Sequence, residues 1–208
     1  MPFIVFEGLD QSGKSTLIQS LSKELEKRNV EFVLTREPGG TTLGEKIREV
    51  VLHPYDPISP EVEILLISAS RRDHIEKVIM PSLEGGKWVI CDRFWPSTSA
   101  FQGAGRGLLA EQVKWLNQFT VPEHITPDLW VLLDMPVVEK DRRSQIQGHS
   151  TDRFEMQDRL FHQRVRESYL SMAKENKDSW FVLNALLSKE ELKKQVVEEL
   201  KKRKWLNY

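Results

Sequence analysis

Short apolar segments alternate along the chain with longer segments in which apolar residues recur at helical spacing. Strands are predicted where Val, Ile, Leu and aromatic residues form nearly continuous runs, at 3–7, 31–35, 87–91, 129–134 and 180–183. Helices are predicted between them, at 14–28, 43–52, 60–80, 109–119, 136–145, 153–175 and 189–203. The alternation predicts an α/β fold with a parallel sheet, and the apolar runs predict strands that are buried on both faces beneath helices.

Composition fits this segmentation. The chain has 208 residues, of which 39% are hydrophobic and 29% charged, as is typical of a globular domain with its own core. We find no internal repeat and no low-complexity linker, and most prolines fall at junctions between predicted elements, where a missing amide donor is tolerated. The sequence therefore predicts a single domain over residues 1–208.

Charge and cysteine content exclude several classes of protein. The longest apolar runs are far shorter than the roughly 18 to 20 residues of a membrane-spanning helix, and the first residues lack the pattern of a secretory signal. The single cysteine, Cys91, excludes an intrachain disulfide. Lys and Arg number 30 against 31 Asp and Glu, so no basic excess is available for a nucleic-acid backbone. We expect a cytoplasmic protein that binds neither membrane nor nucleic acid.

A phosphate-binding pattern lies between the first predicted strand and the first predicted helix. The sequence GLDQSGKS at 8–15 matches the P-loop: Gly, four residues, Gly, Lys, then Ser or Thr. Its glycines let successive backbone amides wrap a phosphate at the positive end of a helix. Lys14 is placed for the β- and γ-phosphates and Ser15 for Mg²⁺. The predicted ATP-binding residues are Gly8, Leu9, Asp10, Gln11, Ser12, Gly13, Lys14, Ser15 and Thr16.

The P-loop alone leaves the class of reaction open. The sequence lacks the Asn-Lys-x-Asp segment with which GTPase switches read guanine, and it has no long basic face for translocation on nucleic acid. A small-molecule kinase fits best, and a nucleotide-controlled binding module is the alternative from another class. A second phosphate-binding subsite distinguishes the two, because a switch needs none.

Candidate residues for such a subsite follow two of the predicted strands. Asp92 and Arg93 come directly after 87–91, and Arg36 follows 31–35 in a turn rich in Pro and Gly. Ligands bind at the carboxyl ends of strands in open α/β sheets. A guanidinium can bind a phosphate through two parallel hydrogen bonds, and a carboxylate can hold the hydration shell of Mg²⁺. We therefore predict a second phosphate site beside the P-loop.

Four segments taken together resemble one family. They are EGLDQSGKST at 7–16, TREPGGT at 35–41, DRFWPSTSAFQG at 92–103 and GRG at 105–107. Their order and spacing over nearly the whole chain are similar to those of the thymidylate kinases. The resemblance implies Mg²⁺-dependent transfer of the γ-phosphate of ATP to dTMP, giving dTDP. It also implies a nucleoside-monophosphate-kinase fold with a five-stranded parallel sheet, helices on both faces and a mobile lid, and a homodimer.

The resemblance implies roles on the phosphate side of the site. Asp10 would lie near the 3′-hydroxyl of the acceptor and the magnesium shell, which gives Ser15, Asp10 and Asp92 as the metal-site residues. Arg36 and Arg93 would bind the acceptor phosphate.

Further roles concern the base and sugar of the acceptor. Arg71 matches the arginine that reads the edge of thymine, four residues after the position that stacks on the base and therefore on the same helical face. That position is usually Phe in the family and is Ile67 here. An aliphatic contact retains only part of the stacking energy, so a kinase for another nucleoside monophosphate is the second hypothesis. Phe101 matches the aromatic residue that favours a deoxyribose, with Ser97, Thr98 and Gln102 as polar neighbours.

Additional positive charge near the γ-phosphate is expected from the lid. Some thymidylate kinases carry Arg directly after the P-loop Asp, whereas this chain has Gln11 and resembles the members that supply a lid arginine. The polar segment at 141–153 is the predicted lid, with Arg142, Arg143 and Arg153 as candidates. The predicted catalytic residues are Lys14, Arg93, Asp10, Arg143 and Arg153.

Overall fold

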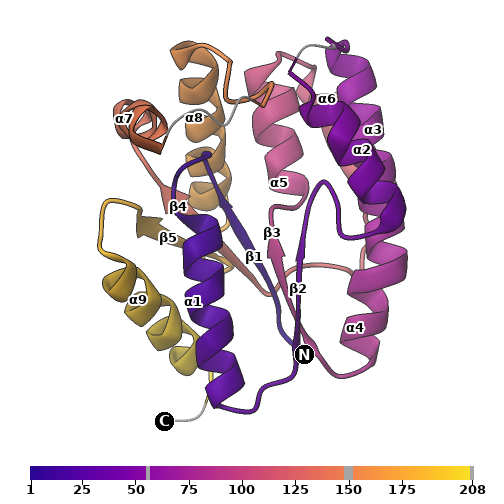
Figure 1. The fold of residues 1–208 in the computed structure, drawn as a ribbon. Coiled ribbons are helices and arrows are strands. Elements are labelled where there is room, and N and C mark those ends of the chain that lie inside the picture. The colour runs from indigo at the N-terminus through magenta and orange to yellow at the C-terminus, as the bar shows by residue number, and fades with distance from the viewer. Residues whose placement is uncertain (55–56, 148–151, 207–208) are drawn as a thin grey trace.

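The computed structural model describes residues 1–54, 57–147 and 152–206. Five strands form one parallel sheet (Figure 1) in the order β2-β3-β1-β4-β5. The strands are β1 (Phe3–Gly8), β2 (Phe32–Arg36), β3 (Trp88–Asp92), β4 (Leu129–Asp134) and β5 (Trp180–Asn184). Each differs from its predicted range by at most one residue at either end. The predicted five-stranded parallel sheet is therefore confirmed.

The register of the sheet brings several predicted site residues to one edge. Phe6 on β1 is the partner of Asp92 on β3, and Asp92 is the partner of Arg36 on β2. On its other side, β1 ends with Gly8 opposite Leu133 of β4. Because β1 is the central strand, the loop that follows it lies between the carboxyl ends of its two neighbours, where α/β sheets bind ligands.

The prediction that the strands are buried on both faces is correct for the three inner strands and wrong for the two edge strands. Only the last residue of β3 and of β4 is more than slightly exposed, and β1 is buried throughout. Leu34 on β2 and Val182 on β5 are 45% and 46% exposed. An edge strand has a neighbour on one side only, so the helical layers that cover the centre of the sheet leave part of it open.

Most helices lie where they are predicted. The helices α1 (Lys14–Lys27), α2 (Thr42–Leu52), α6 (Ala110–Thr120), α7 (Val137–Gln147) and α9 (Lys189–Lys202) match predicted ranges to within two residues. Figure 1 shows α1 and α9, which contact each other, on one side of the sheet. None of the helices in the described part of the chain is long and apolar enough to cross a membrane.

The range 60–80, predicted as one helix, is divided among three consecutive helical elements. It comprises α3 (Pro60–His74), a π-helical turn η1 (Ile75–Ile79) and α4 (Met80–Glu84). Pro81 follows the π-helical turn, at the start of α4, where its missing amide donor costs little. Two elements after β3 were not predicted, the short α5 (Trp95–Thr98) and a second π-helical segment, η2 (Ser99–Gly105).

The predicted helix start at residue 153 is wrong, because α8 spans Arg159–Glu175. Asp158 is its N-cap and accepts a hydrogen bond from the Phe161 amide at 2.7 Å. The preceding turn is held by Asp152, whose carboxylate accepts from the amides of Phe154 and Glu155, both at 2.9 Å. Side-chain capping by two aspartates therefore replaces the first turns of the predicted helix.

The π-helical segment η2 packs tightly against α8. A Cβ atom at Gly105 would lie 2.5 Å from the Phe161 ring, so only glycine fits at this contact. Arg164 on α8 donates hydrogen bonds to the carbonyl oxygens of Ala104 and Gly105 at 3.0 and 2.8 Å. These contacts hold the end of η2 against α8 and fix the position of the segment that carries Phe101.

Candidate active site

The loop between β1 and α1 has the backbone of a phosphate cradle. Gly13 is the N-cap of α1 with φ 94°, and Gln11 also has a positive φ, 64°. Gly8 has φ 138°, and a Cβ atom there would lie 2.6 Å from the Leu133 carbonyl oxygen. Glycine is thus required at this crossing point on both conformational and steric grounds.

Lys14 folds back over this loop. Its Nζ donates hydrogen bonds to the carbonyl oxygens of Gly8 and Leu9 at 3.2 and 3.1 Å. Burial, together with the nearby cation of Arg93, lowers the pKa of Lys14. The ammonium lines a cavity with the P-loop, where a phosphate would replace its two carbonyl partners.

The oxygen atoms of two side chains fit a magnesium site at the end of β3. The Ser15 hydroxyl donates to Asp92 Oδ2 at 3.3 Å. Asp92 Oδ1 is buried and, within the described residues, has no hydrogen-bond partner. Mg²⁺ prefers oxygen ligands and usually retains several waters, so a hydroxyl and a carboxylate beside a phosphate cavity are a suitable donor set.

Arg93 lies at the centre of the site with φ 73°, which is uncommon for a residue other than glycine. Its Nη1 donates to the Gly8 carbonyl at 2.9 Å and to the hydroxyls of Ser97 and Tyr169, both at 3.2 Å. Its Nη2 forms an ion pair with Asp10 at 2.6 Å. Burial opposes both charges, yet each partner favours the ionised form of the other, so the pKa of Arg93 is raised and that of Asp10 is lowered.

Glu7 and Tyr169, which hold the surroundings of Arg93, were not predicted as site residues. Tyr169 on α8 donates to Glu7 Oε2 at 2.8 Å, and the Ser97 hydroxyl donates to the same oxygen at 2.7 Å. Glu7 is fully buried and accepts at Oε1 from the Phe94 amide at 2.9 Å, and burial raises the pKa of its carboxyl group. The Glu7 carboxylate therefore orients the two hydroxyls that hold Arg93.

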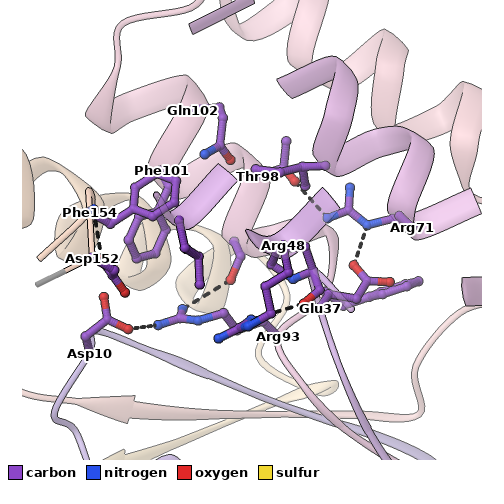
Figure 2. A pocket seen from close by; sticks show the side chains of 15 residues that line it. Asp10, Glu37, Arg48, Arg71, Arg93, Thr98, Phe101, Gln102, Asp152 and Phe154 are labelled. Atoms are coloured by element: carbon purple, nitrogen blue, oxygen red, sulfur yellow. Dashed lines mark hydrogen bonds and ion pairs between the residues drawn. The ribbon is translucent and has the colours of Figure 1, made fainter. Parts of the chain in front are cut away.

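A second cavity, of about 530 Å³, adjoins the phosphate cavity (Figure 2). We call it the acceptor cavity, and the two cavities share Asp10, Glu37, Arg48 and Arg93. The acceptor cavity is lined by Asp10, Glu37, Pro38, Arg48, Leu52, Ile67, Arg71, Arg93, Phe94, Ser97, Thr98, Phe101, Gln102, Asp152 and Phe154. The residues predicted for base, sugar and phosphate of the acceptor, Arg36 excepted, thus surround one space.

Arg71 is held rigidly in the wall of the acceptor cavity. Its Nε donates to Glu37 at 2.7 Å, its Nη1 to the Asn117 side-chain oxygen at 3.2 Å and its Nη2 to the Thr98 hydroxyl at 2.8 Å. Glu37 also contacts the His74 ring at 3.1 Å. A guanidinium has five N–H groups, so two remain for a ligand. Glu37 and Asn117 were not predicted.

Aromatic residues close the opposite side of the cavity. Phe101 packs edge-on against Phe154 and Phe161, with ring centroids 5.5 and 6.0 Å away. The Arg93 guanidinium lies over the face of Phe101, 5.0 Å from its centroid. Ile67 on α3 is buried and lines the same space. Phe101, Ile67 and Arg93, predicted to contact the sugar, base and phosphate of the acceptor, therefore line one cavity.

Two more arginines, Arg36 and Arg48, line the phosphate cavity. Arg36, predicted as a clamp, is half-exposed and pairs with Glu45 at 2.8 Å. Arg48 on α2 was missed, although it lines both cavities and donates to the Pro38 carbonyl at 3.0 Å. Burial, and then the Arg36 cation, lowers the pKa of Arg48. Arg48 follows no strand, so the sequence carried no signal except an arginine on the amphipathic helix after the Pro-Gly turn.

The lid candidates separate into two groups. Arg143 on α7 donates to the carbonyl oxygens of Gln11 and Ala185 at 3.2 and 2.9 Å. With Arg142 it lines a third cavity, on the other side of the P-loop, together with Gln11, Ser12, Gly13, Thr16, Leu17, Ile146, Ala185, Leu187, Ser188, Lys189 and Leu192.

Arg153 has a different location. It pairs with the buried Glu63 and donates to the Ile58 carbonyl at 3.3 Å, and it lines none of these three cavities. The middle of the predicted lid, 148–151, lies outside the described residues. The structure thus places Arg143 beside the P-loop and Arg153 behind the acceptor cavity.

The chain is similar to known proteins over nearly its whole length. The family model described as thymidylate kinase matches residues 6–196. The thymidylate kinase of Bdellovibrio bacteriovorus is 44% identical over 99% of this chain and 98% of its own length, and that of Nitrosomonas eutropha is 42% identical over 96% and 92%. The crystal structure of thymidylate kinase from Ehrlichia chaffeensis superposes with a TM-score of 0.77 at 33% identity, covering 96% of this chain and 98% of that one. The chain belongs to the thymidylate kinase family.

Proposed function

We propose that this protein is a kinase that transfers the γ-phosphate of ATP to dTMP, giving dTDP. The observation that carries the proposal is the pair of adjoining cavities, one at the P-loop and one lined by Arg71 and Phe101, which share Asp10 and Arg93. A nucleotide-controlled switch needs only the first cavity. Two phosphate-bearing ligands that meet at Arg93 are what phosphoryl transfer requires.

The donor would bind at the P-loop with Mg²⁺. Ser15 and Asp92 would hold the ion directly or through its waters, with Asp10 in the surrounding shell. Bound magnesium neutralises charge on the β- and γ-phosphates. Lys14 would contribute a fixed cation from the loop itself, and the third cavity beside Arg143 would receive the nucleoside of the donor.

The acceptor would lie with its phosphate at Arg93 and its base at Arg71. Arg36 and Arg48 would contribute further positive charge to the phosphate, and Ile67 would contact the face of the base. A strong general base is not needed, because the second pKa of a phosphate monoester is near 6 and the attacking oxygen is already largely ionised. Arg143, beside the P-loop at one end of the predicted lid, would supply charge at the γ-phosphate.

A second copy of the chain is the proposed partner. The outer faces of α3 and α6 carry neighbouring apolar side chains, among them the stacked pair Trp115 and Phe119, which are 62% and 69% exposed. Val62 and Leu65 on α3 are exposed as well. Such a patch favours a homodimer, and it should give a dimeric mass in light scattering that Trp115→Ser with Phe119→Ser converts to a monomer.

We place the enzyme in the cytoplasm, where a reducing environment suits its one cysteine. Cys91 is buried beneath the site, and burial raises the pKa of its thiol well above the usual value. It is therefore a packing residue rather than a nucleophile.

The decisive experiment is a coupled assay of ADP release with Mg²⁺ and ATP, with and without each of dTMP, dUMP, dCMP and dGMP. Release that depends on acceptor and is fastest with dTMP supports the proposal. Release that is independent of acceptor, or absent, supports a switch instead. A preference for a purine would show that Ile67 belongs to a different base pocket.

A further inference from the structure

A buried carboxylate stands directly behind the acceptor cavity. Glu63 on α3 is fully buried and accepts hydrogen bonds from three side chains. Gln102 Nε2 donates to its Oε1 at 2.7 Å, Arg106 Nη2 donates to its Oε2 at 3.1 Å, and Arg153 Nη2 donates to the same Oε2. Two arginines therefore form ion pairs with this one buried carboxylate.

The ionised Glu63 fixes which end of the Gln102 amide faces the cavity. A carboxylate accepts hydrogen bonds but cannot donate one, so the amide nitrogen must point to Glu63. The amide oxygen is left for the acceptor cavity, which Gln102 lines (Figure 2). Among the described residues no hydrogen bond is formed by this oxygen. Turning the amide over would bring its oxygen against the carboxylate, with a lost hydrogen bond and a buried repulsion.

We propose that Glu63 is a specificity-determining positioning residue, which locks the Gln102 amide so that it presents an acceptor to the imide N–H of thymine or uracil. The proposal rests on the proposed function and concerns which base that acceptor cavity selects. Arg71, with its two remaining N–H groups, supplies the donor beside this acceptor.

The locked arrangement rejects cytosine on both counts. An imide base offers a carbonyl oxygen next to an N–H, which matches a guanidinium next to an amide oxygen. Cytosine has an amino group and an unprotonated ring nitrogen at these two positions, so donor would face donor and acceptor would face acceptor. Arg71 has no alternative protonation state, and Gln102 cannot turn while Glu63 holds its nitrogen. Selection against cytosine therefore depends on a residue that never touches the base.

The test uses Glu63→Gln, which keeps the size of the side chain but can either donate or accept. The measurement is kcat/KM for dTMP, dUMP and dCMP in the full-length enzyme. We expect the ratio of kcat/KM for dUMP to that for dCMP to fall about tenfold or more, because the Gln102 amide is free to turn. The ratio for dTMP to dUMP, which differ only by the methyl group, should stay unchanged.

Arg106→Lys is the matched control. It perturbs Glu63 without changing its acceptor-only chemistry, so its dUMP to dCMP ratio should remain that of the wild type.

Three results would overturn the proposal. One is an unchanged dUMP to dCMP ratio in Glu63→Gln, even with a lower Tm, which would mean a purely structural role. Another is an equal fall of the ratio in Arg106→Lys, and the third is a parallel fall of the dTMP to dUMP ratio. A wild-type enzyme that phosphorylates none of the three pyrimidine nucleotides would instead contradict the proposed function.

Discussion

The arginines on the two sides of the P-loop differ in how they are held. On the acceptor side, Arg71 and Arg93 have side chains that are 1% and 15% exposed, and their partners come from several distant elements. On the lid side, Arg142 and Arg143 are 60% and 24% exposed and both pair with Glu139, one turn earlier on the same helix. Hydrogen bonds from these two arginines lower the pKa of Glu139 to about 2.

The difference indicates two ways of bringing positive charge to a phosphate. Acceptor-side arginines are preorganised, so they lose little freedom when a ligand binds. On the lid side, Arg142 is held by an exposed pair of small energetic value, which a phosphate can replace at little cost, whereas Arg143 also donates to the carbonyl oxygens of Gln11 and Ala185. The proposed acceptor site is thus built before a ligand arrives, whereas on the proposed donor side Arg142 can exchange its partner for a phosphate.

Removing the central preorganised arginine is expected to have the largest effect. Arg93→Ala should lower kcat by about a thousandfold, the scale of losing a donor to the transferred group, and should leave Asp10 without its ion pair. Arg93→Lys should recover only a small part, because Lys cannot form the same set of hydrogen bonds. Steady-state kinetics with dTMP measure both. An Arg93→Ala enzyme within tenfold of wild type would contradict the central position given to Arg93.

Arg143→Ala removes one of the two arginines on the lid side. We expect a fall in kcat of about a hundredfold, while the affinity for ADP, measured by calorimetry, falls less, because ADP loses the Arg143 contact in the third cavity but has no γ-phosphate. The contrasting variant is Arg153→Ala, which should lower Tm markedly, since Glu63 loses a buried partner. Near-normal turnover in Arg143→Ala would refute the assignment of Arg143 as the lid arginine.

A smaller effect is expected when the residue proposed to contact the base in the acceptor cavity, Ile67, is changed. Ile67→Phe should lower the KM for dTMP by about threefold to tenfold, because an aromatic ring gains stacking energy over an aliphatic contact. Ile67→Leu, which alters shape without adding a ring, should leave KM nearly unchanged. A higher KM in Ile67→Phe would mean that the cavity beside α3 cannot hold both a ring and a base.

The smallest expected effect concerns the helices on either side of the lid. Lys140 on α7 contacts His162 Nε2 on α8 at 2.9 Å, and both residues are buried. Burial, and then the Lys140 cation, lowers the pKa of His162, while Asp10 and Asp141 oppose the shift. The unfolded chain thus binds more protons than the folded one, so stability is complete above about pH 6.5 and falls as the pH drops through the lowered pKa.

Lys140→Met should therefore reduce the loss of Tm between pH 7.5 and pH 5, by less than about 3 °C in a chain of this size. His162→Asn, which removes the titrating ring, should reduce it further. Thermal unfolding followed by circular dichroism at several pH values provides the measurement. An unaltered pH dependence in both variants would show that this contact does not contribute to acid sensitivity.

The parts of the site that could be predicted from sequence are those formed by residues that are adjacent along the chain. The P-loop carries its geometry in its own glycines, and Asp92 and Arg93 follow a strand that the apolar pattern locates. Glu37 and Asn117 were missed as partners of Arg71, because they lie 34 and 46 residues from it and no local pattern encodes such a contact. Glu63 lies at a core-facing helical position, where a charged residue is not expected. Its burial is explained by ion pairs with Arg106 and Arg153, which are distant in sequence.

Helix ends show the same limit at shorter range. The N-cap signal of α8 is present in Asp158, yet the predicted helix began at 153, since polar residues between them permit a helical pattern. The π-helical segments η1 and η2 depend on packing against other elements, so periodicity at 3.6 residues could not predict them.

The close contact at Gly105 sets a limit on how this sequence can vary. Any larger residue there would push on Phe161, and the Phe161 ring supports Phe101 in the wall of the acceptor cavity. The displacement caused by a methyl group at position 105 would therefore pass through the Phe161 and Phe101 rings to the proposed sugar subsite. For enzyme engineering, Gly105 is therefore a position where substitution is expected to disturb the acceptor cavity, although this residue does not line it.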